Sequence, residues 1–339
     1  MFKKPKDCLG AVLPDAESIY IQRYLDFFPE DSLAGMKVGL YEHSGVGRDI
    51  LFTVLSSLGA DVVRLGRSDA FVPVDTEAIR QQDIEQATTW VGQYGLDAIV
   101  STDGDADRPL VGDEKGEWLR GDVAGVLCAE YLGVAHLVTP VSSNSVVEKC
   151  RLFQSVTRTQ IGSPYVIAGM QQAASSESGI VAGYEANGGF LLQTRVVASG
   201  GQLDALPTRD AVIVIVSLLV SAWGRSRKVS ELAAALPSRY TASDRVKQFA
   251  TDKSRQCINR LFSEDKGYDE IEAEFGSLCG NVKSVDLTDG LRITFSNNEI
   301  VHLRPSGNAP EFRCYNEADS PSRVTELNSA CMQIIQGWR

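Results

Sequence analysis

The sequence lacks the features of membrane proteins and of nucleic-acid-binding proteins. Its longest apolar run, Ala211 to Trp223, spans about thirteen residues and contains two serines, so it is too short to cross a bilayer. No basic tract offsets the excess of 44 acidic over 33 basic side chains, which leaves a net charge of -11. We therefore expect no membrane and no nucleic-acid partner, and any anionic ligand must be met by local arginines.

Paired cysteines are absent as well. The seven cysteines are scattered, odd in number and form no C-x-x-C pair, so we expect free, mostly buried thiols in a reducing compartment. The charged N-terminus, Met1 to Cys8, is not followed by the apolar segment of a signal peptide. Both observations predict a cytoplasmic location.

Carboxylates, in contrast, are crowded into one loop. The aspartate loop, residues 103–108, follows a short apolar strand and carries Asp103, Asp105 and Asp107 with small residues between them. Mutual repulsion would raise the pKa values of these carboxyl groups unless a cation lies among them. The three oxygen ligands predict a divalent metal site, with Mg²⁺ expected before Ca²⁺ or Mn²⁺. Arg108 would lie beside this site and could hold a phosphate oxygen that the metal also contacts.

Two other interpretations of the aspartate loop are a solvated acidic turn and an EF-hand. The EF-hand is considered because Glu114 is at position twelve when Asp103 is counted as one. Arg108, however, stands at position six, where the EF-hand turn needs glycine. A strand rather than a helix also leads into the loop, and Pro109 follows it, which argues against an EF-hand.

Alternating strands and helices predict an α/β fold for most of the chain. From residue 37 to residue 100, apolar strands and amphipathic helices follow the β-α-β-α-β order of a parallel sheet, and this order recurs from 121 onward. The aspartate loop would lie at the carboxyl end of a strand, where ligands gather in such sheets. After 237, strands joined by tight turns predict an antiparallel sheet.

The predicted fold class is therefore α/β, with two successive α/β domains that have mainly parallel central sheets, followed by an α+β domain. The expected division is an N-terminal helical segment, a metal-binding α/β domain, a second α/β domain with a linker, and the α+β domain: residues 1–35, 36–120, 121–237 and 238–339.

The glutamate loop, residues 185–189, also follows an apolar strand. Glu185 can accept hydrogen bonds and Asn187 can both donate and accept them, which suits two neighbouring hydroxyls of a sugar. Gly188 and Gly189 would let a sugar ring approach the backbone closely. Ser163 is a weaker candidate for contact with the same ligand. A plain structural turn with Asn-Gly chemistry is the alternative.

The arginine loop, residues 304–313, lies between strands of the last domain. It offers the guanidinium, hydroxyl, amide and backbone donors that a phosphate group requires. A hairpin loop that is merely polar is the alternative. The candidate phosphate ligands are Arg304, Ser306, Gly307, Asn308 and Arg313.

Together the three loops resemble the motifs of the α-D-phosphohexomutase superfamily, in the family's order. The aspartate loop is similar to its D-G-D-G-D-R metal loop, with Ala106 in place of a glycine. The glutamate loop is similar to its G-E-x-S-G-H sugar loop, with Asn187 at the place of the serine and Gly189 at the place of the histidine. The arginine loop is similar to its R-x-S-G-T-x-P phosphate loop, with Asn308 for the threonine.

The resemblance covers residue 36 to the end, the equivalent of the second, third and fourth domains of the family. It implies Mg²⁺ held by the three aspartates, sugar contacts from the glutamate loop and phosphate contacts from the arginine loop. The implied reaction is the interconversion of hexose 1-phosphate and hexose 6-phosphate, with mannose or glucose as the hexose. The Asn-Gly-Gly form of the glutamate loop resembles the phosphomannomutases among the family.

One part of the family's machinery is not found. In the family, a serine in a T-A-S-H-N-P or similar loop of the first domain carries the phosphoryl group. No serine is followed by histidine in this sequence, and neither Ser44 nor Ser243 lies in a matching loop. We therefore expect that the first domain is lacking and that the chain alone is inactive or weakly active. A separate chain could supply that domain, or a bared apolar face could favour a homo-oligomer.

Two functions of other classes are also considered. A non-catalytic protein could use the same loops to bind or sense a sugar phosphate. A metal-dependent phosphatase built on the aspartates would need an aspartate nucleophile with a nearby lysine, and the sequence shows no such pair.

Overall fold

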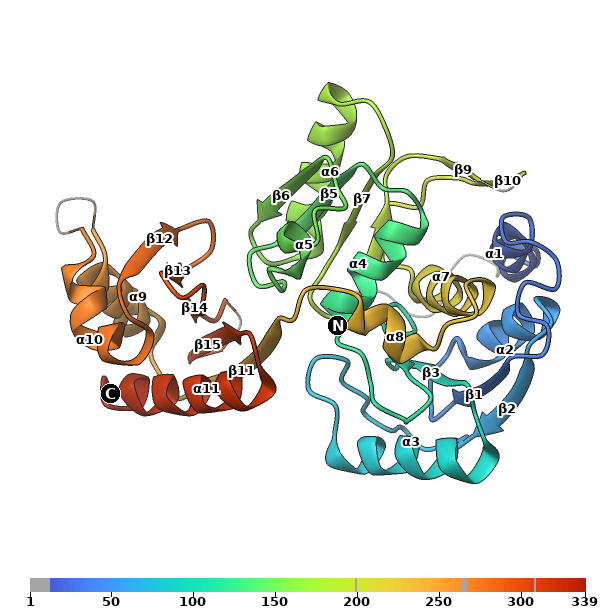
Figure 1. Cartoon of the computed structure of the whole chain (residues 1–339), viewed down its shortest axis with the longest axis horizontal. Coiled ribbons are helices and arrows are strands. Elements are labelled where there is room, and N and C mark those ends of the chain that lie inside the picture. The colour runs from blue at the N-terminus through green and yellow to red at the C-terminus, as the bar shows by residue number, and fades with distance from the viewer. Residues whose placement is uncertain (1–12, 199, 264–266, 308) are drawn as a thin grey trace, which may run out of the picture.

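The computed structural model describes residues 13–198, 200–263, 267–307 and 309–339, which form three main β-sheets and one small hairpin (Figure 1). In the first sheet the strand order is β2-β1-β3-β4. Its first three strands are parallel and β4 is antiparallel to β3. The strands are β1 (Lys37–Tyr41), β2 (Asp61–Leu65), β3 (Ala98–Thr102) and β4 (Pro109–Gly112), connected by helices α2 (Arg48–Ser57) and α3 (Gln81–Tyr94).

The second sheet repeats this topology with the strand order β6-β5-β7-β8. Again three parallel strands are followed by one antiparallel strand, so the repeat predicted from the order of elements is confirmed. The strands are β5 (His136–Pro140), β6 (Ser155–Thr159), β7 (Val181–Tyr184) and β8 (Phe190–Leu192), and the helices are α4 (Gly121–Tyr131), α5 (Val146–Lys149) and α6 (Ser163–Ser176). Strands β4 and β8, which the sequence did not reveal, close the sheets beside the aspartate and glutamate loops.

Helix α7 (Ala211–Gly224) explains the longest apolar run of the sequence. Every residue from Ala211 to Ala222 is buried, because the helix contacts α4, β3, β4 and β8 and so lies between the first two sheets (Figure 1). A helix that is apolar on all sides requires such surroundings. The first two sheets therefore share one hydrophobic core. No helix in the described part of the chain has the length and apolar character needed to cross a membrane.

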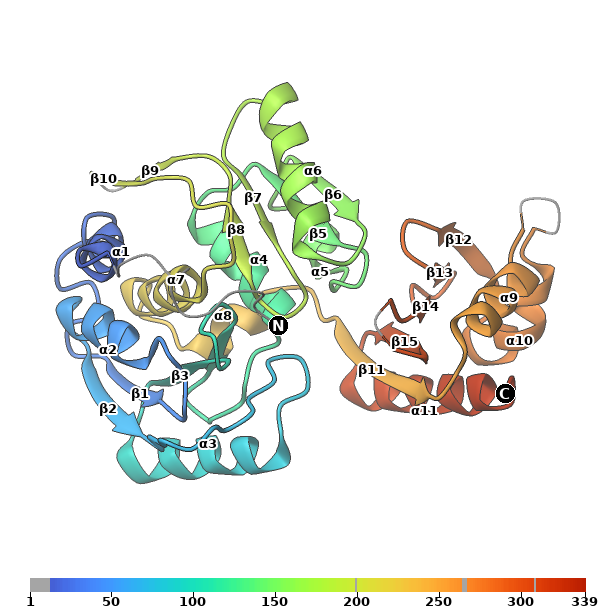
Figure 2. The same cartoon turned by 180° about the vertical axis from the view of Figure 1, so that it is seen from behind.

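The C-terminal sheet has the strand order β11-β15-β14-β13-β12 and is antiparallel throughout its described strands, as predicted. It has its own core. Strand β11 carries the chain from the part that holds the first two sheets into this third sheet (Figure 2). Its strands are β11 (Tyr240–Lys247), β12 (Val282–Asp286), β13 (Leu291–Phe295), β14 (Ile300–Pro305) and β15 (Glu311–Ala318), and its helices are α9 (Thr251–Leu261), α10 (Asp269–Cys279) and α11 (Pro321–Gln336).

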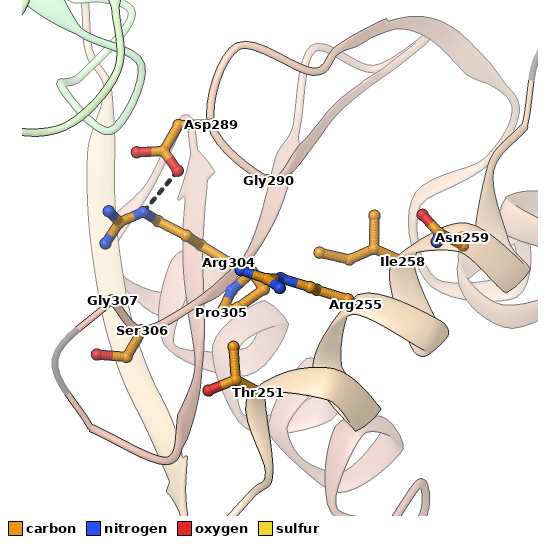
Figure 3. A pocket seen from close by; sticks show the side chains of 10 residues that line it. All are labelled: Thr251, Arg255, Ile258, Asn259, Asp289, Gly290, Arg304, Pro305, Ser306 and Gly307. Atoms are coloured by element: carbon orange, nitrogen blue, oxygen red, sulfur yellow. Dashed lines mark ion pairs between the residues drawn. The ribbon is translucent and has the colours of Figure 1, made fainter.

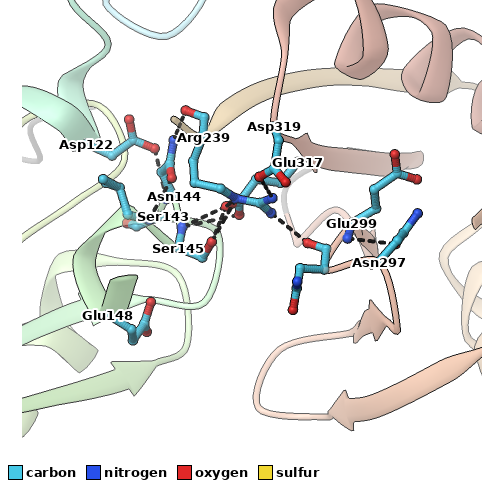
Figure 4. A network of polar contacts seen from close by, with 12 residues as sticks. Asp122, Ser143, Asn144, Ser145, Glu148, Arg239, Asn297, Glu299, Glu317 and Asp319 are labelled. Atoms are coloured by element: carbon cyan, nitrogen blue, oxygen red, sulfur yellow. Dashed lines mark hydrogen bonds and ion pairs between the residues drawn. The ribbon is translucent and has the colours of Figure 1, made fainter. Parts of the chain in front are cut away.

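A buried arginine joins the second sheet to the C-terminal sheet. The side chain of Arg239 has no exposed surface, and its Nε lies 2.6 Å from Oε1 of Glu317 while its Nη1 lies 2.6 Å from Oδ1 of Asp319 (Figure 4). The same Nε donates to the hydroxyl of Ser145, 3.1 Å away, beside α5. The charge of Arg239 is thus fully paired where the chain passes between the two sheets.

Residues 224–237, whose sequence predicts the linker at the end of the second α/β domain with one helical turn, pack against the core. They contain helix α8 (Val229–Ala234), whose Val229 and Leu232 are buried in the shared core. The carboxylate of Glu114 accepts a hydrogen bond from the hydroxyl of Ser230 at 2.6 Å, which fastens α8 to the first sheet. The small hairpin of β9 (Val196–Ala198) and β10 (Gly201–Leu203) precedes α7.

Helix α1 (Ala16–Leu25) is tied into the shared core. The hydroxyl of Tyr24 donates to the carboxylate of Asp210 at 2.7 and 2.6 Å, and the hydroxyl of Tyr20 donates to it at 2.9 Å. The same carboxylate accepts from the backbone N–H of Ile213 and so caps α7. Asp210 therefore anchors two helices at once.

Removal of one of these donors should destabilise the fold. In Tyr24→Phe the buried carboxylate of Asp210 loses a donor, so we expect the free energy of unfolding to fall by about 1 to 3 kcal/mol in urea denaturation. Tyr94→Phe is the control, because Tyr94 is 37% exposed and should change stability by less than about 0.5 kcal/mol. Equal stability of Tyr24→Phe and the wild-type chain would contradict this role of Asp210.

Candidate functional site

The aspartate loop is built around the carboxylate of Asp103. Its Oδ1 accepts hydrogen bonds from the backbone N–H groups of Asp107 and Arg108, each at 3.2 Å, and these bonds curl the loop after β3. Ala106 adopts a left-handed φ of 64°, a conformation that glycine reaches without strain. In this loop the three aspartates each offer a carboxylate oxygen, and these oxygens lie within 4.8 Å of one another. The structure therefore brings the three predicted metal ligands together.

The electrostatics of the loop fit a divalent cation. Burial raises the pKa of Asp103 from 3.8 to about 6, against the backbone hydrogen bond from Arg108, and the charges of Asp105 and Asp107 raise it further. Burial also raises the pKa of Asp107. Among the described residues, Oδ1 of Asp107 is buried and accepts no hydrogen bond. Three converging carboxylates, one of them with an oxygen that accepts no hydrogen bond, form a donor set of the kind that Mg²⁺ prefers.

Arg108 lies beside this cluster, as the sequence predicts. Its Nε is 3.7 Å from Oδ2 of Asp103 and 3.8 Å from Oδ1 of Asp107, and its side chain is 36% exposed. The guanidinium group therefore remains open to an anion from solvent.

The glutamate loop turns tightly after β7. The backbone N–H of Gly188 donates to the carbonyl of Glu185, and Gly188 has a φ of 89°. The carboxylate of Glu185 accepts a hydrogen bond at 2.8 Å from the hydroxyl of Ser163, the first residue of α6. The Oδ1 of Asn187 accepts from the N–H of Gly189 at 2.9 Å, so this oxygen stabilises the turn itself. Glu185 and Ser163 thus form a hydrogen-bonded pair. The side-chain oxygen of Asn187 instead stabilises the turn, which is the role that a plain Asn-Gly structural turn would give it.

Arg209 connects these two loops, and the sequence did not reveal it. Its Nη2 lies 2.6 Å from Oδ2 of Asp107, and its Nη1 lies 3.8 Å from Oε2 of Glu185. Arg209 immediately precedes Asp210, the cap of α7, and belongs to no recognisable motif. Only its position in the sequence next to a helix cap could have drawn attention to it.

The arginine loop borders a cavity of about 420 Å³ at the start of α9 (Figure 3). Its lining residues from the arginine loop are Arg304, Pro305, Ser306 and Gly307, and those from α9 include Thr251, Arg255 and Asn259. Arg313 lies opposite Arg304 in the register of β14 and β15 but does not line the cavity. Asn308 lies outside the described residues.

Asp289 connects this cavity to the second sheet. Its Oδ1 lies 2.9 Å from Nε of Arg304, and its Oδ2 accepts a hydrogen bond at 3.0 Å from the backbone N–H of Ile161. Ile161 is two residues before Ser163, which holds Glu185. Arg209 therefore contacts the aspartate and glutamate loops directly, and Asp289 joins the arginine loop to the segment that precedes Ser163.

Ser44 has a structural role. Its Oγ accepts a hydrogen bond at 2.8 Å from the backbone N–H of Val72, which joins two loops of the first sheet. Ser243, the other serine that resembles part of the family's loop, lies within the edge strand β11.

The chain matches known proteins over nearly its whole length. Residues 20–116 match the phosphoglucomutase/phosphomannomutase alpha/beta/alpha domain II, residues 120–240 match domain III, and residues 258–333 match the C-terminal domain. A phosphomannomutase of Salmonella muenchen is 47% identical over 99% of this chain and 69% of its own length. A phosphomannomutase of Sinorhizobium fredii is 42% identical over 95% of this chain and 67% of its own length.

The solved structures agree with this assignment. A phosphoglucomutase/phosphomannomutase family protein of Burkholderia thailandensis, 15% identical, superposes with a TM-score of 0.69 over 95% of this chain and 64% of its own. The fold is therefore that of the phosphohexomutases. The chain belongs to the phosphoglucomutase/phosphomannomutase family, a family of mutase enzymes, and spans about two thirds of the length of these relatives.

Binding of a divalent cation at the aspartate loop should depend on pH through Asp103. Because the pKa of Asp103 is raised from 3.8 to about 6, the metal-free fold gains stability from this group at low pH and loses it as the pH rises through about 6. Above that value the ionised carboxylate is available to a cation. We therefore expect Mg²⁺ to raise the melting temperature clearly at pH 7 and much less at pH 5.

A ligand variant serves as the control for this thermal-shift measurement. Asp105 is exposed, so Asp105→Asn should fold normally and lose most of the Mg²⁺-dependent shift at pH 7. A shift of the same size in Asp105→Asn, or at both pH values in the wild-type chain, would count against the aspartate loop as the metal site.

Proposed function

We propose that this chain provides the metal, sugar and phosphate sites of a phosphomannomutase, which interconverts hexose 1-phosphate and hexose 6-phosphate with Mg²⁺. The observation that carries this proposal is the connection of three loops from three sheets through Arg209 and Asp289. The two phosphomannomutases that share 47% and 42% of its residues support mannose as the hexose. The free thiols at the six cysteines of the described residues support a cytoplasmic location.

Each loop has a distinct part in the proposed reaction. Asp103, Asp105 and Asp107 would hold Mg²⁺, which when bound neutralises charge on the transferring phosphoryl group. Arg108 would donate hydrogen bonds to the same phosphoryl group. Glu185 would accept hydrogen bonds from sugar hydroxyls.

The distal phosphate of the sugar would bind in the cavity beside Arg304. Arg304 and Ser306 would then anchor the hexose by the phosphate that does not react. Because that contact is made at a distance from the metal, either the 1- or the 6-hydroxyl could face the phosphoryl donor. Arg304 would have to exchange its ion pair with Asp289 for the incoming phosphate.

We propose that the serine that carries the phosphoryl group is not among these 339 residues. No serine is followed by histidine in the sequence, and Ser44 is engaged by the backbone of Val72. The chain by itself would then bind a sugar phosphate and a metal but turn over slowly, and a separate chain that carries the serine could complete the site. A sugar-phosphate sensor is the second candidate, favoured by the same lack of a Ser-His pair.

Isothermal titration calorimetry tests the binding part of the proposal. Mannose 1-phosphate should bind more tightly in the presence of Mg²⁺ than in its absence. Arg304→Gln should weaken this binding about tenfold or more, because a charge-assisted contact with the phosphate is lost. The control is Arg225→Gln, at a surface ion pair with Glu130, which should bind as the wild-type chain does. Unchanged binding by Arg304→Gln would remove the phosphate site from this cavity.

A coupled assay of mannose 1-phosphate conversion, with a hexose bisphosphate as activator, tests the catalytic part. We expect binding without appreciable turnover by the chain alone. Brisk turnover would overturn the proposal that the phosphoryl carrier is missing. Binding with no turnover even after addition of a Ser-His-loop domain in trans would instead favour the sensor.

A further inference from the structure

The methylene groups of the Arg209 side chain, its stem, pass over the glutamate loop at Gly189, where the loop has no side chain. A Cβ atom at Gly189 would lie 2.7 Å from Cδ and 2.9 Å from Cγ of Arg209, which is closer than real Cβ contacts. The backbone of Gly189 is not in the left-handed region, so its conformation does not require glycine. The small residue at 189 is therefore needed for space. That space is occupied by the arginine.

The guanidinium group of Arg209 ends between the aspartate loop and the glutamate loop. It contacts Oδ2 of Asp107 at 2.6 Å and approaches Oε2 of Glu185 at 3.8 Å. The other oxygen of Asp107, Oδ1, has no hydrogen-bond partner among the described residues. Arg209 thus pairs with one oxygen of Asp107 and leaves the other without a hydrogen bond.

Two arginines flank Asp107. Arg108 approaches it from within the aspartate loop, at 3.8 Å, and Arg209 approaches it from the start of α7. The side chain of Arg209 is 26% exposed, so part of the guanidinium group faces solvent. An anionic group bound to a cation at the aspartate loop would meet hydrogen-bond donors from both.

We propose that Arg209 is a further substrate-binding residue, which donates hydrogen bonds to the phosphoryl group at the metal site. Residue 189 is then glycine because the methylene groups of Arg209 need the space that a Cβ atom would fill. This inference rests on the proposed function, because it requires a sugar phosphate at the aspartate loop.

The proposal has an electrostatic signature that a purely structural role lacks. A positive charge beside the aspartates attracts an anion and repels a cation. Removal of Arg209 should therefore weaken the binding of a sugar phosphate while leaving the affinity for Mg²⁺ alone unchanged or higher. If the arginine only supported the fold, both affinities would fall together with stability.

Isothermal titration of the full 339-residue chain separates these cases. With saturating Mg²⁺, Arg209→Gln should bind mannose 1-phosphate about ten- to a hundredfold more weakly than the wild-type chain. Arg209→Lys should restore part of the affinity, because an ammonium group keeps the charge but lacks the planar fork. Titration with Mg²⁺ alone should show no loss of affinity in either variant.

Two further variants complete the test. Gly189→Ala keeps the charge of Arg209 but displaces its stem, so it should weaken mannose 1-phosphate binding in the same direction. Arg195→Gln is the matched control, because Arg195 forms an exposed ion pair with Asp204 next to the hairpin of β9 and β10. It should bind both ligands as the wild-type chain does, and melting curves should show that all variants are folded.

The outcomes distinguish the two levels of the proposal. If the Arg209→Gln variant binds mannose 1-phosphate as tightly as the wild-type chain does, only the role of Arg209 is overturned. Parallel loss of Mg²⁺ and mannose 1-phosphate binding in Arg209→Gln would also overturn it, in favour of a structural role. A wild-type chain that binds no mannose 1-phosphate would overturn the proposed function and this inference with it.

Discussion

Repulsion among the carboxylates of the aspartate loop is the constraint on which the site depends. Three of them converge to within 4.8 Å in a partly buried loop, and burial raises the pKa of Asp103 to about 6. Such an arrangement is costly unless positive charge compensates for it. The fold supplies part of that charge through Arg108 and Arg209, and Oδ1 of Asp107, which accepts no hydrogen bond, is a place where a cation would supply the rest.

Helix α7 holds this charge balance in place. Its apolar body fills the core between the first two sheets, and its N-terminus is fixed by Asp210, which also receives the hydroxyls of Tyr20 and Tyr24. Arg209 is the residue before that cap, so the rigidity of the core extends to a side chain of the site. The buried helix α7 can therefore fix the position of Arg209, and through it the spacing of the aspartate and glutamate loops.

The C-terminal sheet has a separate core and reaches the site through polar contacts. Arg239 pairs with Glu317 and Asp319 on one side of the connection, and Asp289 accepts from Ile161 on the other. Since Asp289 also pairs with Arg304, the phosphate cavity and the position of the sheet are linked by one carboxylate. A phosphate that displaced Asp289 from Arg304 would act on both.

The sequence alone determined those features that depend on residues close to one another along the chain. Strand β3 with its crowded aspartates, the apolar helix α7 and the parallel order of the first two sheets follow from local spacing and hydrophobic pattern. Helix α10 also carries a readable pattern, with Ile271, Phe275 and Cys279 spaced four residues apart and buried in the C-terminal core. Arg209 and Asp289 could not be found in this way, because each acts on residues far away in sequence. Only the tertiary structure brings these isolated charges to their partners, since long-range ion pairs leave no periodic trace in a sequence.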